Sequence, residues 1–132
     1  MINSVEQAIA QLQNAELPEV ERVNAVRFLQ GNPTPQAVDA LVEVLDDDDH
    51  GVRWSAGSAL AFIGEPAMPA ILRALITPDT SRVLRDGVHH VIVDNSSPKV
   101  RAECQDLLKA LKGSQSGIAS MEAALKLTRV FA

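Results

Sequence analysis

Apolar residues recur three and four positions apart along this chain, in stretches separated by short polar or proline-containing turns. This spacing places the apolar side chains on one face of an α-helix, and no stretch shows the strict alternation of a half-buried strand. The pattern therefore predicts an all-α protein with eight helices, at about residues 4–14, 18–30, 35–45, 50–64, 66–76, 79–94, 98–112 and 117–131.

Prolines and small hydroxyl residues mark the starts of these helices. All seven prolines lie near the beginning of an apolar-periodic stretch, where a helix tolerates proline because its first amide protons have no partner within the helix. Ser4 and Gln7 have the spacing of a capping box. A hydroxyl residue also stands in the N-cap position directly before proline at Thr34-Pro35, Thr77-Pro78 and Ser97-Pro98.

The predicted helices repeat with a period of about 31 residues. In the second helix of each pair a small residue is followed four positions later by an apolar one, which allows a neighbouring helix to approach closely. The small positions are Ala25, Ala56, Gly87 and Ala119, and the apolar positions are Leu29, Leu60, Val91 and Ala123. Because one hairpin cannot bury its apolar stripe alone, four hairpins (about 4–30, 35–64, 66–94 and 98–131) are expected to stack into one solenoid domain, 1–132.

Two segments resemble a known repeat family. DDDDHGVRWSAGSALAFIG (46–64) is similar to the inner half of a HEAT repeat, with an acidic turn, Val-Arg, and then small and aliphatic positions ending in Gly. SPKVRAECQDLLKAL (97–111) carries a second Val-Arg after a turn. The short period resembles the HEAT-like repeats first described in phycobiliprotein lyases, and the resemblance covers most of 18–112. It implies an α-α superhelix whose second helices line a concave, partner-binding surface. The third hairpin departs from the pattern at Leu84, Gly87 and His90.

Composition and charge narrow the range of possible functions. Hydrophobic residues make up 46% and charged residues 22%, as in ordinary globular domains. The net charge of -5 and the lack of a clustered basic face argue against a nucleic-acid binder. The single Cys104 excludes an internal disulfide and fits a reducing compartment. With no signal-like amino terminus and no apolar run near the roughly 20 residues that span a bilayer, we expect a cytoplasmic protein without a membrane segment.

Adjacent His89 and His90 raise the question of a metal or catalytic site. At 100 degrees per residue, His90 joins Asp86 and Asp94 in a ladder along one helix edge, while His89 points about 100 degrees away. Three ligands at most then lie along one helix, which is poor support for a transition-metal site. We expect His90 to be hydrogen-bonded by one or both aspartates, with a metal site and a pH-sensitive contact as alternatives.

The acidic run Asp46–Asp49 has neither the alternating ligand spacing nor the closing glutamate of a calcium loop. A helix follows directly, so capping and the helix dipole account for aspartates there, with one of them expected to pair with Arg53. The sequence also contains no glycine-rich phosphate loop and no nucleophile elbow. We therefore expect no catalytic residue, no metal and no cofactor.

Trp54, the only tryptophan, is the strongest candidate for a contact residue. Its helical position faces away from the Ala56 stripe, so it either anchors a partner or fills a gap between hairpins. The repeat register extends this position into a mixed aromatic and cationic strip on the concave face, and Trp and Arg dominate interface energies. The predicted partner-binding residues are Val23, Trp54 and Arg85, with Arg27, Ser58 and His89 one turn further on. Such a strip favours an acidic partner.

Two functions from different classes follow. The first is a non-catalytic scaffold that binds another protein, or a second copy of itself, along the concave surface. The alternative, implied by the resemblance to phycobiliprotein lyases, is lyase-like or chaperone-like chromophore handling, with His89, Arg85 and Trp54 gripping an acidic, aromatic pigment. Nucleic-acid binding is a third and weaker hypothesis.

Overall fold

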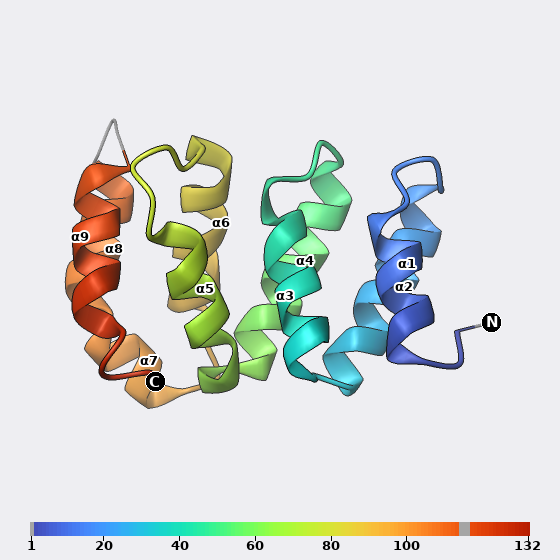
Figure 1. Ribbon diagram of the computed structural model, residues 1–132, viewed down its shortest axis with the longest axis horizontal. Coiled ribbons are helices and arrows are strands. Elements are labelled where there is room, and N and C mark those ends of the chain that lie inside the picture. Colours follow the sequence, from blue (N-terminus) through green and yellow to red (C-terminus); the bar gives the residue numbers. More distant parts are fainter. Residues whose placement is uncertain (1, 114–116) are drawn as a thin grey trace.

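The computed structural model describes residues 2–113 and 117–132. Over these residues the fold is all-α and contains no strand, which confirms the predicted fold class (Figure 1). The α-helices are α1 (Val5–Gln13), α2 (Glu19–Gly31), α3 (Pro35–Glu43), α4 (His50–Ile63), α5 (Met68–Leu75), α6 (Arg82–Val93), α7 (Pro98–Glu103), α8 (Gln105–Gly113) and α9 (Ile118–Leu127), with short 3-10 helices η1 (Val44–Asp46) and η2 (Glu65–Ala67).

Several predicted caps are present. The side chains of Ser4, Thr34 and Ser97 accept hydrogen bonds from backbone amides three residues on, and begin α1, α3 and α7. The cap expected at Thr77-Pro78 is wrong, because α6 begins only at Arg82 with Ser81 as its N-cap. The helix expected over 98–112 is also divided in two at Cys104.

The helices form two layers, which Figure 1 shows one in front of the other. Helix α4 packs between α2 and α6, and α8 extends this layer beyond α6. The other layer contains α1, α3, α5 and α9 in that spatial order. The last hairpin is therefore reversed relative to the prediction, which placed 117–131 beside the second helices. Both of its helices bury apolar residues, Leu107 and Leu111 from α8 and Ala124 and Leu127 from α9, so the sequence pattern fits either arrangement.

The core is aliphatic. The buried positions show that the predicted alignment of the third repeat is wrong by one residue. Ala25 and Ala56 are fully buried as expected, but their counterpart in α6 is the buried Val88 rather than the half-buried Gly87. Four residues later, the counterpart of Leu29 and Leu60 is Ile92. The predicted small position Ala119 is exposed. The connection before α6 is one residue longer than the repeat period predicts, and this shifts every position in that helix.

The helices α2, α4 and α6 each carry an arginine at the same position near the N-terminal end. Arg22, Arg53 and Arg85 each stand four residues after the N-cap of α2, α4 and α6. Arg22 is almost fully buried and holds the first two hairpins together, since Nε donates to the carbonyl of Leu12 and both terminal nitrogens donate to Asp47, at 3.0 and 2.7 Å.

Among the described residues no single helix is long and apolar enough to cross a lipid bilayer. Only His50–Ile63 and Glu65–Leu75 taken together reach the required length and composition, and the chain bends by 119° between them.

Candidate functional site

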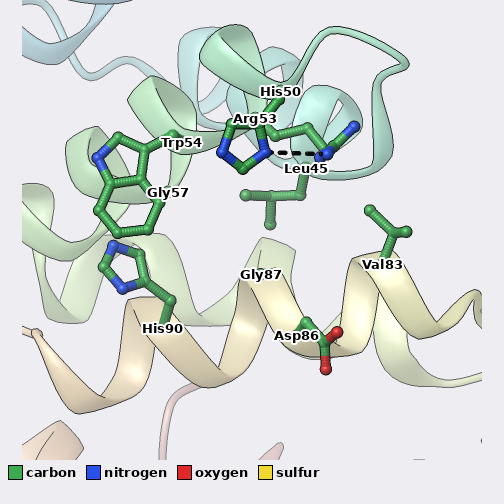
Figure 2. Close-up of a pocket in the computed structure, with 9 residues that line it drawn as sticks. All are labelled: Leu45, His50, Arg53, Trp54, Gly57, Val83, Asp86, Gly87 and His90. Atoms are coloured by element: carbon green, nitrogen blue, oxygen red, sulfur yellow. Dashed lines mark hydrogen bonds between the residues drawn. The ribbon is translucent and has the colours of Figure 1, made fainter.

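A cleft of about 270 Å³ lies between α4 and α6, next to the turn that precedes α4 (Figure 2). Two glycines, Gly57 on α4 and Gly87 on α6, keep side chains out of the space between the helices. Trp54 and His90 form one wall and Leu45 closes the back (Figure 2). The complete lining is Leu45, His50, Arg53, Trp54, Gly57, Val83, Asp86, Gly87 and His90.

The wall of the cleft is a stacked pair of rings. The rings of Trp54 and His90 lie 4.5 Å apart between centroids and are inclined by 27°. A Cβ on Gly57 would lie only 3.2 Å from His90 Cδ2, so this glycine gives the imidazole room beneath the indole. Trp54 is still 58% exposed. The indole thus contacts the third hairpin through His90 and also leaves a broad aromatic surface in solvent.

His90 is held from its other side by Asp94. His90 Nδ1 lies 3.1 Å from the Asp94 carboxylate, as the sequence predicts. Asp86, the other aspartate of the expected ladder, instead lies 3.5 Å from Arg82 Nε. His90 Nε2 is buried and has no hydrogen-bond partner. A carboxylate only accepts hydrogen bonds, so it fixes the hydrogen of a neutral His90 on Nδ1 and makes Nε2 an acceptor.

The upper rim of the cleft is formed by His50 and Arg53. One terminal nitrogen of Arg53 donates to the backbone carbonyl of Asp47 at 2.7 Å and more weakly to that of Asp48 at 3.3 Å. The other terminal nitrogen lies 3.1 Å from His50 Nδ1 (Figure 2). An arginine cannot accept a hydrogen bond, so His50 Nδ1 is the acceptor in this contact. Arg53 is thus bound to the turn, and no aspartate carboxylate pairs with it as the sequence suggested.

The acidic turn has a structural role. Asp49 caps α4 by accepting from the amide of Val52 at 3.1 Å. The hydrogen bonds from Arg22 lower the pKa of the Asp47 carboxyl, and the backbone amide of Asp49 contributes to this shift. Glu19 lies at the neighbouring end of α2. A side-chain hydrogen bond with Asp49 and the negative charge of Asp49 raise the pKa of Glu19.

The predicted partner-binding residues do not form one strip. Trp54, Ser58 and Arg27 are exposed and Val23 is half-buried. Arg85 is buried at 4% exposure, and it donates to the carbonyl and hydroxyl oxygens of Thr80 in the connection before α6. The prediction that Arg85 shares the surface of Trp54 is wrong, because the shift of register in α6 makes it the counterpart of Arg53.

The remaining predicted residue, His89, lies outside the cleft. It is half-buried and lines a shallow hollow together with Arg82, Asp86 and residues Leu111 and Lys112 of α8. His90, one residue on, is the histidine that contacts Trp54. The corrected register also makes Asp86 the exposed counterpart of Trp54 in the next repeat.

Sequence reasoning missed an aromatic residue on the same helix. Phe62 is 66% exposed and stands eight residues after Trp54, so both rings lie on one side of α4 with Ser58 between them. Val83 and Val93 of the adjacent α6 are also exposed, at 42% and 49%. The i, i+4, i+8 spacing of Trp54, Ser58 and Phe62 could have predicted this shared side of the helix. An apolar residue at the end of a buried helix is, however, ordinarily assigned to the core. We call Trp54, Ser58 and Phe62, with Arg27 of α2 and Val83 and Val93 of α6, the Trp54 face.

Within residues 2–113 and 117–132, no group of three or more His, Cys, Asp or Glu side chains is arranged to hold a metal ion.

A family model for HEAT repeats matches residues 5–92, which is more than half of the 132 residues. The chain therefore belongs to the HEAT-repeat family, whose members are commonly protein-interaction scaffolds and typically lack catalytic activity. The match does not distinguish the short phycobiliprotein-lyase type from other HEAT repeats. No curated protein and no solved structure matches the chain.

Proposed function

We propose that this protein is a non-catalytic scaffold that binds a protein partner through the Trp54 face. The observation that carries the proposal is the exposure of Trp54 near the N-terminal end of α4, with a second exposed aromatic ring, Phe62, two turns further along the helix. Side chains of this size stabilise a complex strongly when they are desolvated, and a cluster of them on the surface marks an interaction site. Ser58 between the two rings leaves space for a partner side chain to enter.

Chromophore handling is less well supported. The cleft beside Trp54 is about 270 Å³, below the roughly 300 to 1,000 Å³ of pockets that enclose drug-sized ligands. Neither Arg85 nor His89, the residues expected to grip a pigment, lines this cleft. The space suits one side chain of a protein partner better than an extended pigment.

The proposal is tested by comparative capture from a lysate of the source cells. Wild-type protein, Trp54→Ala and Leu125→Ala are immobilised, and captured proteins are quantified by mass spectrometry. Leu125 is a matched control because it is an apolar residue, 48% exposed, on α9 in the other layer. We expect Trp54→Ala to lose specific partners by about tenfold and Leu125→Ala to keep them. Equal capture by wild type and Trp54→Ala, with unchanged circular dichroism, would refute the proposal.

A further inference from the structure

Three exposed aspartates, Asp46, Asp48 and Asp86, lie in or next to the Trp54 cleft. The connections before α2, α4 and α6 lie along one edge of the molecule (Figure 1), and the connection before α4 consists largely of aspartates. Asp46 and Asp48 are exposed and take part in none of the ion pairs found among the described residues. Asp86, on the opposite side of the cleft, has a side chain that is 65% exposed.

The arginines four residues after the N-caps of α2, α4 and α6 are directed into the protein, whereas Arg27 of the Trp54 face is exposed. The guanidinium of Arg22 is neutralised by Asp47, and Arg85 is buried against Thr80. Arg53 donates to backbone carbonyls of the turn before α4. Arg82, at the start of α6, presents an exposed guanidinium and lies beside Asp86. The expectation of an acidic partner depended on Arg85 and Arg27, and of these two only Arg27 is exposed.

The shape of the cleft suits a long side chain with a charged end. Leu45 and Val83 provide apolar surface, and the exposed indole of Trp54 lines the same space beside His90 (Figure 2). Lysine and arginine bury their methylene groups along apolar surface while the charged group stays near water. A cation above the face of an indole is attracted by the negative potential of the ring, and tryptophan is the strongest partner of this kind.

We propose that the Trp54 cleft binds a lysine or arginine side chain from a basic segment of the protein partner. The methylene groups lie against Leu45 and Val83, the cationic group stacks on Trp54, and the carboxylate of Asp86, which lines the cleft, balances its charge. Asp46 and Asp48, exposed in the turn next to the cleft, add to the negative potential. The inference rests on the proposed function, because it names the chemistry of the partner that the Trp54 face would bind.

A test can use the single tryptophan as a reporter. The indole N–H of Trp54 gives one resonance in a ¹H–¹⁵N spectrum, and it can be followed during titration with four short peptides, Ac-GLXLG-NH2. X is arginine, lysine, citrulline or glutamate, and citrulline has almost the shape of arginine without its charge. We expect saturable shifts with arginine and lysine, and binding weaker by about fivefold or more with citrulline and glutamate.

Two carboxylate variants locate the charge. Asp86→Asn should weaken binding of the arginine peptide and reduce its dependence on salt, since exposed charges are screened by ions. Asp39→Asn removes the same charge from α3 in the other layer, where Asp39 pairs with Arg73, and should leave binding unchanged. Equal weakening by both variants would show a general effect of net charge and overturn the assignment of this cleft.

The outcomes separate this inference from the proposed function. If the four peptides bind equally, or none shifts the Trp54 resonance, the inference is wrong. The scaffold proposal would still stand if Trp54→Ala loses its partners in the capture experiment. If Trp54→Ala retains its partners, the scaffold proposal fails whatever the peptides do.

Discussion

The ion pair between Arg22 and Asp47 gives the sharpest prediction about stability. Its side chains are only 4% and 18% exposed, and both terminal nitrogens of the guanidinium bond to the carboxylate. Asp47→Asn leaves Arg22 buried without an anion. Removing one partner of a buried pair costs about 3 kcal/mol or more, and the remaining exposure of Asp47 places the expected loss near the lower value. Urea unfolding followed by circular dichroism measures the loss.

The same pair predicts a pH dependence. Arg22 lowers the pKa of Asp47 in the folded state, so the carboxylate contributes its stabilisation fully above the unfolded pKa of about 3.9. This contribution is lost as the pH falls through the lower, folded-state pKa. The stability difference between wild type and Asp47→Asn should therefore stay constant down to about pH 5 and shrink below about pH 4.

Asp39→Asn is the control for both measurements. It removes an exposed pair, Arg73–Asp39, whose side chains are 64% and 59% exposed, and should cost less than about 1 kcal/mol. If Asp47→Asn costs no more than Asp39→Asn, or if its cost grows as the pH falls, the energetic role given to the Arg22–Asp47 pair is wrong.

Three further outcomes are expected. Gly87→Ala should stabilise the protein by about 0.5 to 1 kcal/mol in urea unfolding, because an alanine Cβ would meet Leu45 at an ordinary 3.6 Å within a helix; a loss of stability would contradict this. Gly57→Ala should gain less and should alter the fluorescence of Trp54, since its Cβ would press on His90 at 3.2 Å; an unchanged spectrum would argue against the stacked pair. Burial raises the pKa of the Cys104 thiol to about 11. Iodoacetamide at about pH 8 should therefore alkylate the native protein about a hundredfold more slowly than the urea-unfolded chain, as measured by mass spectrometry. Similar rates would show that the thiol is accessible.

Local patterns predicted most of the fold, and the errors arose where two local patterns were equally good. The helical spacing and caps such as Thr34 and Ser97 depend on neighbouring residues, so they can be derived from the sequence alone. In α6 the pair Gly87 and Val91 and the pair Val88 and Ile92 both place a smaller residue four positions before an aliphatic one. Only the cap at Ser81 selects between them.

The candidate site was predicted in part for the same reason. Trp54 was expected either to anchor a partner or to fill a gap between hairpins, and its position opposite the buried stripe of α4 agrees with its 58% exposure. Arg85 was placed beside it by the incorrect register, and a long cationic side chain is ordinarily exposed. Its burial depends on oxygens of Thr80 in the preceding connection, whose position follows from tertiary structure.

One link between distant segments limits how far the repeats can be treated as interchangeable units. Ser96, which follows α6, donates its amide to the carbonyl of Ala61 at 2.9 Å and its hydroxyl to that of Phe62 at 3.0 Å, at the end of α4. Gly64 permits this approach, because its φ is +83° and a Cβ there would lie 2.6 Å from Ser96 Oγ. The second hairpin is thus bonded to the segment that follows the third. Excising or duplicating the third hairpin as a module would leave the end of α4 without these donors, so redesign of this solenoid has to move the 94–97 connection together with the repeat it follows.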